Sequence, residues 1–317
     1  MSKLVITVTL NPALDKTVTI EGLEVGGLNR VDDIRVDAGG KGINVAKVLK
    51  GFNENVTAVG FMGGHNGKLI LEGLERAGIE HSFTETSAET RMNLKVVDST
   101  VQVTTEINER GGAVSEQERA QFQQTLENHL DKASILVLGG SIPPGIEHDE
   151  YASLITTAKS KGVKTILDAD GDALRYGLVA CPYVIKPNIH ELEQLLGVSL
   201  ESDEEIVQAA RKLTAQGIEW VIVSMGGDGS VAVSKDEAIR ARPFRIKPES
   251  TVGAGDSMVA AIASSLLQGR GLEETLRYAT AAGSVTASKP GTQVCRMDEV
   301  EERLNDVGIT RIEVRTT

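Results

Sequence analysis

Cysteine, proline and aromatic residues are all scarce in this sequence. Its 317 residues include 2 Cys and 8 Pro, and Phe, Trp and Tyr together make up 3%. Cys181 and Cys295 match no C-x-x-C spacing, so we expect neither a disulfide framework nor a structural zinc site. This cysteine usage is typical of a reducing compartment, and we expect a cytoplasmic protein.

Long apolar segments are also missing. No uncharged apolar run reaches the roughly 18 residues that a membrane helix requires. The N-terminus has a short apolar run at 4–10 but lacks the apolar core and small-residue cleavage site of a signal peptide. We therefore expect no membrane partner.

Basic residues are outnumbered by acidic ones. Lys and Arg total 33 and Asp and Glu total 45, which gives a formal net charge of −12. Such a charge repels phosphate backbones and anionic lipid heads, so nucleic acid is not an expected partner. The hydrophobic share of 40% and the charged share of 25% are those of a folded globular chain. The length allows two small domains or one large α/β domain with an insertion.

From about residue 130, short β-branched runs alternate with helix-length amphipathic segments, which is typical of repeated βαβ units. The runs are apolar on consecutive positions, as expected for parallel strands covered by helices on both faces. This pattern predicts an α/β fold with a mostly parallel sheet flanked by helices. The expected strands are 134–138, 163–167, 183–185 and 220–223, and the expected helices are 149–159, 188–196 and 203–216.

The N-terminal third contains two kinds of strand pattern. Residues 4–10 and 56–60 are continuously apolar and predict buried strands. Four other segments alternate apolar and polar residues, which indicates a sheet with one wet face. These segments come from two separate parts of the chain, so we expect a small sheet that stands off the main domain and covers a cleft. They are 17–20, 30–36, 92–97 and 101–107.

Glycines and an acid open an apolar helix expected at 258–268. The run is Gly253, Ala254, Gly255 and Asp256. Backbone N–H groups at a helix start carry partial positive charge, and glycine lets that backbone approach a ligand closely. The segment therefore predicts an anion site. The alternative is that Asp256 only caps the helix.

A second glycine-rich segment, 39–46, leads into a helix that ends near Leu49. Lys41 in this segment is not a P-loop lysine, because G-x-x-x-x-G-K-[ST] is absent. The dinucleotide pattern G-x-G-x-x-G also fails, since Met258 stands where its third glycine would follow Gly253 and Gly255. This failure argues against a nicotinamide-dependent dehydrogenase. A plain strand-to-helix turn is the alternative for the segment.

Several polar turns directly follow expected strands. They are 11–15, 186–191 and 224–229. In open α/β sheets, ligands bind beyond the carboxyl ends of the strands, so these turns and the Gly253 turn should line one crevice. The alternative for Asn188 and Glu191, three residues apart, is that they are no more than a capping pair.

Five segments, given at the end of this paragraph, together resemble the PfkB, or ribokinase-like, family of sugar kinases, over nearly the whole chain. Within that family the sequence is most similar to the branch of bacterial 1-phosphofructokinases, with tagatose-6-phosphate kinases as near relatives. The resemblance implies one Rossmann-like kinase domain over 1–317, with a β-sheet lid from about 12–37 and 90–108. It also implies ATP as donor and Mg²⁺ as helper ion. The segments are Thr-Leu-Asn-Pro-Ala-Leu-Asp (9–15), Gly-Gly-Lys-Gly-Ile-Asn-Val-Ala (39–46), Gly-Gly-Ser-Ile-Pro-Pro-Gly (139–145), Lys-Pro-Asn (186–188) and Thr-Val-Gly-Ala-Gly-Asp-Ser (251–257).

The resemblance also implies roles for individual residues. Asp256 would be the general base, and the backbone of Gly253, Ala254 and Gly255 would hold the transferring phosphoryl group. Glu191 would organise Mg²⁺ through water. The implied substrate-binding residues are Asp15, Gly39, Gly40, Lys41, Asn44, Arg91 and Ser141. The implied nucleotide-binding residues are Lys186, Asn188, Glu191, Ser224, Gly226, Gly229 and Thr251.

The implied reaction is phosphorylation of D-fructose 1-phosphate to the 1,6-bisphosphate by ATP. Lys41 and Arg91 would neutralise the phosphate already on the sugar, with Arg30 as a substitute for a lysine that some relatives use. D-Tagatose 6-phosphate is the alternative acceptor, because it needs the same kinds of group. A non-catalytic sugar-phosphate sensor is disfavoured by the intact Gly-Ala-Gly-Asp run. The lid strands have edges that need cover, and relatives pair such lids, so we expect a homodimer through the lid.

Overall fold

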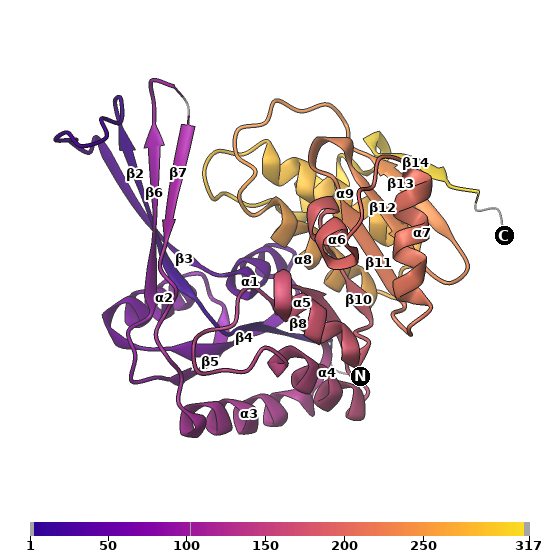
Figure 1. The fold of residues 1–317 in the computed structure, drawn as a ribbon, viewed down its shortest axis with the longest axis horizontal. Helices are drawn as coiled ribbons and strands as arrows, with labels where there is room; N and C mark the ends of the chain where they lie inside the picture. The colour runs from indigo at the N-terminus through magenta and orange to yellow at the C-terminus, as the bar shows by residue number, and fades with distance from the viewer. Residues whose placement is uncertain (1–2, 102, 314–317) are drawn as a thin grey trace.

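A large mixed sheet forms the centre of the protein (Figure 1). The computed structural model describes residues 3–101 and 103–313. Within them the main sheet has ten strands in the order β14-β13-β12-β11-β10-β9-β8-β1-β4-β5. Neighbours from β11 to β5 pair in parallel, and β12, β13 and β14 pair antiparallel at one end. The strands are β1 (Leu4–Thr9), β4 (Asn55–Met62), β5 (Glu80–Glu85), β8 (Ala133–Gly139), β9 (Lys164–Asp168), β10 (Val184–Ile185), β11 (Trp220–Ser224), β12 (Ser230–Val233), β13 (Ala238–Arg242) and β14 (Gly308–Arg311).

Helices cover both faces of this sheet, as the continuously apolar strands predict. In β1, Val5 belongs to one hydrophobic layer while Ile6 and Val8 belong to the other, because successive side chains point to opposite faces. The layer around Val5 contains side chains of α1 (Lys41–Gly51), α2 (Gly64–Arg76), α8 (Ala254–Leu267), α9 (Leu272–Ala287) and α10 (Met297–Glu301). The layer around Ile6 contains side chains of α3 (Glu116–Leu130), α4 (Glu150–Ser160), α5 (Gly171–Gly177), α6 (Ile189–Leu196) and α7 (Asp203–Thr214).

A second, four-stranded sheet stands off the main body, on the left of Figure 1. We call it the small sheet. Its order is β3-β2-β6-β7, from two separate parts of the chain, as the alternating segments predict. Its strand β2 begins earlier than expected, so that Asp15 lies within the ladder and pairs in register with Asp37 and Asn93. The strands are β2 (Ala13–Ile20), β3 (Asp33–Gly39), β6 (Arg91–Asp98) and β7 (Val103–Asn108).

Helix α9 is one element that the sequence analysis did not identify. It packs against α8 in the interior, and most of its residues are buried. Only its first turns alternate buried and less buried residues, and small residues such as Ala281, Ala282 and Gly283 fill its second half, which is buried from Tyr278 to Thr286. A helix buried on most sides is hard to predict from periodicity.

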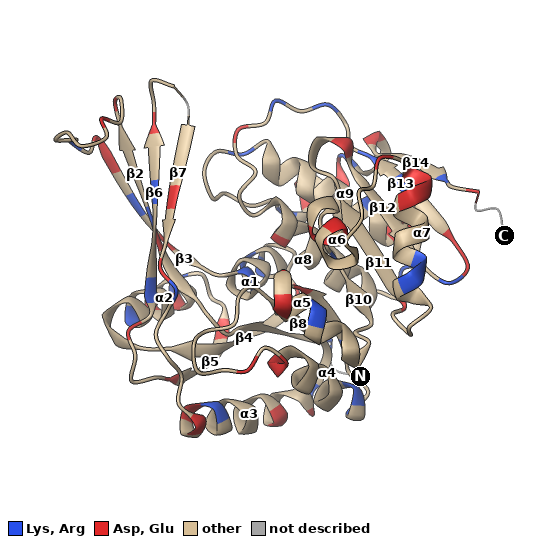
Figure 2. Ribbon diagram, in the orientation of Figure 1, with Lys and Arg blue, Asp and Glu red and all other residues tan. Residues whose placement is uncertain are grey.

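Charged residues of both signs are interspersed over the ribbon in the view of Figure 2. Helix α7 is an example, with Asp203, Glu204 and Glu205 in its first turn and Arg211 and Lys212 in its last. This arrangement complements the helix dipole. Over the described part of the chain, none of the helices combines the length and the apolar character that crossing a bilayer would require.

Candidate active site

The site lies at the topological switch point of the main sheet, where the strand order reverses. Strand β1 lies between β4 and β8, so the segments that follow β1 and β8 diverge at the carboxyl ends of these strands. In open α/β sheets this switch point is where a ligand crevice opens. The side-chain amide of Asn11, after β1, donates to Ser141 Oγ, after β8, over 3.1 Å. Ser141 thus lies beside the end of β1.

The start of α8 contributes the acid of the Gly-Ala-Gly-Asp run. Gly253 precedes the helix with φ of 78°, a left-handed conformation that favours glycine. Asp256, 9% exposed, makes no capping bond to its own helix; instead its Oδ2 accepts a 2.8 Å hydrogen bond from the Asn44 side chain on α1. The alternative that Asp256 only caps α8 is therefore not supported. Its carboxylate faces the glycine-rich segment that begins α1.

Burial raises the pKa of Asp256 to about 6, and the negative charge of Asp168 adds to this rise. The Asn44 hydrogen bond and the ammonium groups of Lys41 and Lys186 lower it. A carboxyl group with such a pKa is ionised at neutral pH and is a better proton acceptor than an exposed aspartate. Perturbed carboxyl groups of this kind are typical of catalytic sites.

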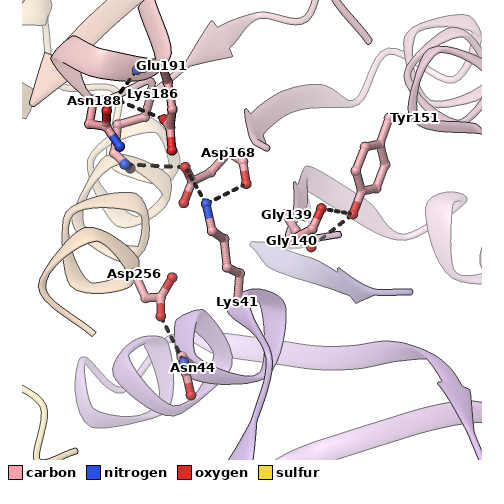
Figure 3. A network of polar contacts seen from close by, with 10 residues as sticks. All are labelled: Lys41, Asn44, Gly139, Gly140, Tyr151, Asp168, Lys186, Asn188, Glu191 and Asp256. Atoms are coloured by element: carbon pink, nitrogen blue, oxygen red, sulfur yellow. Dashed lines mark hydrogen bonds and ion pairs between the residues drawn. The ribbon is translucent and has the colours of Figure 1, made fainter. Parts of the chain in front are cut away.

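A buried carboxylate bridges two lysines next to Asp256 (Figure 3). Asp168, at the end of β9, is 4% exposed. Its Oδ1 lies 3.2 Å from Lys41 Nζ and 3.3 Å from Lys186 Nζ. Although burial opposes ionisation of Asp168, the two lysines hold its pKa below the usual value.

Lys41 lies among three carboxylates. Burial opposes its charge, but Asp168, Glu191 and Asp256 together raise its pKa above the usual value. Lys41 is therefore fixed as a cation between the base candidate and the turns that follow β9 and β10. Its Nζ also donates to the Asp168 backbone carbonyl over 3.3 Å.

Asp15, in strand β2, lies on the side of the site that the small sheet forms. Its Oδ1 accepts a 3.0 Å hydrogen bond from the Asn93 side chain, and its Oδ2 is 3.6 Å from Lys95 Nζ. Gly39 lies against it: a Cβ there would be only 2.5 Å from Asp15 Oδ2. Only glycine lets the α1 segment approach this carboxylate so closely.

Lys47, on α1, is a half-buried lysine whose pKa responds to several carboxylates. Burial lowers the pKa of Lys47, while Asp15 and Asp256, among other carboxylates, raise it. Its Nζ also donates to the Ala38 carbonyl. Gly39 lies against Asp15 and Asn44 binds Asp256, so the short segment 39–44 brings both carboxylates to the same side of the molecule.

Arg91 is anchored by backbone carbonyls. Its Nη2 and Nε donate to the Asn11 carbonyl at 3.0 and 3.3 Å, and its Nη1 donates to the Glu109 carbonyl at 2.9 Å. Burial lowers its pKa, against the raising effect of Asp15 and Glu109. Arg91 therefore lies at the switch point with most of its donors already in use.

The nucleotide-side candidates follow β10 and β11. Asn188 and Glu191 do form a capping box at the start of α6, with bonds of 2.9 and 2.8 Å, as the capping alternative requires. The turns are adjacent, because Ser224 N donates to the Pro187 carbonyl over 3.0 Å. Gly226 and Gly229 have φ of 54° and 93° in the turn after β11. Thr251 is exposed just before α8, with its carbonyl 3.3 Å from Ala254 N.

A hydrated divalent ion fits the carboxylates next to Lys41. Glu191 uses Oε2 for the capping box, and Asp168 is bound through Oδ1. Each carboxylate therefore has a second oxygen outside these contacts. The described residues hold no cluster of three or more His, Cys, Asp or Glu with metal-ligand geometry. Mg²⁺ suits such a sparse donor set, since it usually keeps several waters and binds substrate phosphates.

Sequence reasoning missed three charged residues of the site. Asp168 directly follows an expected strand, the same signal that identified Asn11 and Ser224. Lys47 lies one helical turn after Asn44, and its spacing on the predicted helix could have indicated it. Nothing in the alternating pattern of the segment 92–97 distinguished Lys95 as a partner of Asp15.

Comparison with known proteins identifies the class. A model described as pfkB family carbohydrate kinase matches residues 8–299, so the chain belongs to the pfkB family of carbohydrate kinases. Members of this family are phosphotransferases with an alcohol group as acceptor, and they use ATP with a divalent metal. The chain is therefore a carbohydrate kinase by family, and the cluster around Asp256, Lys41 and Asp168 is its candidate active site.

Individual relatives match over almost their full lengths. The chain is 36% identical to the 1-phosphofructokinase of Bacillus subtilis (strain 168) over 311 residues, which is 98% of this chain and 100% of the relative. Escherichia coli phosphofructokinase-2 is similar both with fructose-6-phosphate (TM-score 0.89, 29% identity) and in a tetrameric inhibited form (TM-score 0.90, 30% identity), each over 96% of this chain and 99% of that one. The Thermotoga maritima ribokinase (TM-score 0.78, 24% identity, 96% and 100% coverage) shows the shared ribokinase-like fold.

Proposed function

We propose that this protein transfers the γ-phosphoryl group of ATP to the free primary hydroxyl of D-fructose 1-phosphate and forms D-fructose 1,6-bisphosphate. One observation carries the reaction type: Asp256 is a buried carboxylate with a pKa near 6, at a helix start and beside two cationic lysines. The acceptor follows from the similarity to the B. subtilis 1-phosphofructokinase.

In this mechanism Asp256 accepts the proton of the acceptor hydroxyl as that oxygen attacks the γ-phosphorus. Phosphoryl transfer through a loose transition state needs little deprotonation of the nucleophile until late, so a base with a pKa near 6 is adequate. The hydrogen bond from Asn44 fixes the carboxylate in one orientation. Positioning and charge neutralisation therefore account for most of the rate enhancement.

The transferring phosphoryl group is held by the start of α8 and by Lys41. The N–H groups of Gly255 and Asp256 are at the helix start, where intrahelical acceptors are lacking and the dipole favours an anion, whereas that of Ala254 already donates to the Thr251 carbonyl. Lys41 lies between Asp168 and Asp256, so we assign it to the transferring group rather than to the phosphate already on the sugar. Mg²⁺, organised by Glu191 through water and by Asp168, would neutralise charge on the ATP phosphates.

Nucleotide and sugar would enter from opposite sides of this group. We assign ATP to the turns that contain Lys186, Asn188, Ser224, Gly226, Gly229 and Thr251. Asp15 accepts hydrogen bonds from sugar hydroxyls, a role that suits a carboxylate already bound by Asn93 and Lys95. Gly39, Gly40 and Asn44 complete the sugar contacts, and Arg91 and Ser141 face the phosphate end.

A coupled assay of ADP release tests the proposal. Purified protein would be given ATP and Mg²⁺ with D-fructose 1-phosphate, D-tagatose 6-phosphate or unphosphorylated D-fructose in parallel. The proposal expects the highest kcat/KM with D-fructose 1-phosphate. Preference for D-tagatose 6-phosphate would replace the acceptor and keep the chemistry. Failure to release ADP with any of the sugars would point to a sugar-phosphate sensor instead.

We further propose that the 317 residues form one kinase domain with the small sheet as its lid, from about 12–37 and 90–108, and that two chains pair through this lid. The small sheet and its connecting turns expose a group of large apolar side chains, and its edge strands β3 and β7 have open sides. Exposed apolar patches and strand edges are typical of protein interfaces. The exposed residues are Leu23, Val25, Leu28, Val31, Ile34, Val36, Val101, Val103 and Ile107.

We place this activity in the cytoplasm. Cys181 and Cys295 are both free in the structure, which suits a reducing compartment. ATP and phosphosugars are also substrates of cytoplasmic chemistry.

A further inference from the structure

An open hollow of about 490 Å³ lies at the switch point of the main sheet. It is lined by residues that follow β1 and β8 and by the segment that follows β7. Asn11 and Ser141, joined by a hydrogen bond, connect its walls. The remaining wall residues that matter for charge are Arg91, Arg110 and His148.

The charge of this hollow is opposite to that of the whole chain. The protein has a net charge of −12, yet none of the described residues that line the hollow is Asp or Glu. Two arginines and a histidine, with hydroxyl and amide groups of Ser141 and Asn11, are the polar groups that phosphate recognition uses. The hollow therefore combines basic and polar groups with the apolar side chains of Ile142, Pro143 and Ile146, in a protein that is acidic as a whole.

The two arginines differ in how many donors they have available. Arg91 already donates from Nε, Nη1 and Nη2 to backbone carbonyls, which leaves only part of its fork for a ligand. Arg110 has an exposed side chain, and none of the ion pairs or hydrogen bonds between described residues involves its guanidinium group. Its backbone is nevertheless fixed, because the Arg110 carbonyl accepts a 3.0 Å hydrogen bond from Asn11. Arg110 thus combines an anchored main chain with a complete set of five donors.

We propose that Arg110 binds the phosphate group of the phosphosugar acceptor and selects for a phosphorylated sugar. This inference rests on the proposed function. Arg91 holds one side of the hollow through its backbone contacts, and Arg110 closes on the phosphate from the segment after β7. Ser141 Oγ, which accepts from Asn11, donates its own proton to a phosphate oxygen.

His148 belongs to the outer wall of the same hollow. Its ring stacks on that of Tyr176, with centroids 6.3 Å apart and planes 17° from parallel. The stack restrains the orientation of the ring in the wall of the hollow. We assign it a weaker, peripheral contact than that of Arg110.

The test compares Arg110→Gln and Arg110→Lys with wild type. Arg110→Gln should raise KM for D-fructose 1-phosphate about 10- to 100-fold, the effect of losing a charge-assisted pair, and change kcat and KM for ATP little. Arg110→Lys should recover part of this loss, because it keeps the charge but not the fork. KM for unphosphorylated D-fructose, where turnover is measurable, should be unchanged. Arg175→Gln, an exposed arginine outside the hollow, is the matched control.

Calorimetric binding of D-fructose 1-phosphate without ATP separates this inference from the proposed function. Turnover of phosphosugar by wild type with unchanged KM and Kd in Arg110→Gln would overturn the role of Arg110 and leave the kinase proposal intact. Weaker binding in Arg110→Gln, with no turnover by wild type, would support the anion site and refute the kinase proposal. If wild type bound neither D-fructose 1-phosphate nor D-tagatose 6-phosphate, both would be refuted.

Discussion

Asn44 and Asp256 are 212 positions apart in the sequence, and a 2.8 Å hydrogen bond joins them. The amide of Asn44 donates to the carboxylate, which links the first turn of α1 to the first turn of α8. Both helices begin after glycines, so two glycine-rich turns face each other across one carboxylate. This contact sets the orientation of Asp256 and lowers its pKa, against the raising effect of burial.

Replacing the proposed base Asp256 should strongly lower kcat and leave the binding of ATP and sugar almost unchanged. Asp256→Asn keeps the shape and the Asn44 contact but cannot accept a proton, so kcat should fall by about 10² or more. The affinities for ATP and sugar should stay within several-fold of wild type. Steady-state kinetics and calorimetry measure the two effects. Asp236→Asn, at an exposed position, is the control, and near-normal turnover of Asp256→Asn would exclude this role.

The Asn44 hydrogen bond predicts the pH dependence. Activity should decline as pH falls through about 6, because Asp256 becomes protonated. Asn44→Leu removes a donor that stabilises the charged form, so the pKa of Asp256 rises and the acidic limb of the kcat profile moves to higher pH. Asn128→Leu, an exposed site on α3, should leave the limb in place. A limb unmoved in Asn44→Leu would contradict this account.

Replacing Asp168 should shift the acidic limb of the kcat profile in the opposite direction, to lower pH. Its charge raises the pKa of Asp256, so Asp168→Asn should move the limb of the residual activity to lower pH. The substitution also leaves Lys41 and Lys186 without their shared partner. Breaking a buried pair costs about 3–5 kcal/mol, so the denaturant midpoint should fall clearly. A variant with wild-type stability and an unchanged limb would show that this triad is unimportant.

The pairing of two lids can be tested at one apolar residue. Ile34 on β3 is 55% exposed. Ile34→Glu places a charge on the proposed interface and should convert the dimer to monomers in sedimentation velocity. Val198→Glu, at a 41% exposed site away from the small sheet, should leave the dimer unchanged. A wild-type chain that sediments as a monomer at micromolar concentration would refute the pairing.

A hydrogen bond joins the small sheet to the turn that follows α9. Thr292 Oγ1 donates to Asp37 Oδ2 over 3.2 Å, and Arg35 Nε donates to the same oxygen over 2.7 Å. Thr292→Val removes one hydrogen bond of about 1 kcal/mol, so KM for the acceptor should rise about fivefold because the proposed lid is held less firmly over the site. Thr104→Val, exposed on β7, is the control. An unchanged KM would show that the contact does not hold the lid.

Prediction from sequence was most successful where the signal was local. The continuously apolar strands, the alternating strands of the small sheet and the glycine-rich start of α8 each follow from a few adjacent residues. Helix α9 was missed because its second half is buried throughout and leaves no amphipathic spacing there. Asp168 was missed although it follows a strand, because a lone aspartate at a strand end does not reveal which cations it will meet.

The sequence by itself determined the α/β class, the two kinds of sheet and the helix start at which Asp256 lies. These depend on periodicity and on glycine conformations, which are properties of neighbouring residues. Only the tertiary structure decided that Lys41 pairs with Asp168, 127 positions away, and that Arg110 lines the same hollow as Arg91 with no ion pair to another described residue. Ion pairing, burial and pKa depend on distances through space between residues far apart in the chain, and the folding of the sheet alone sets those distances.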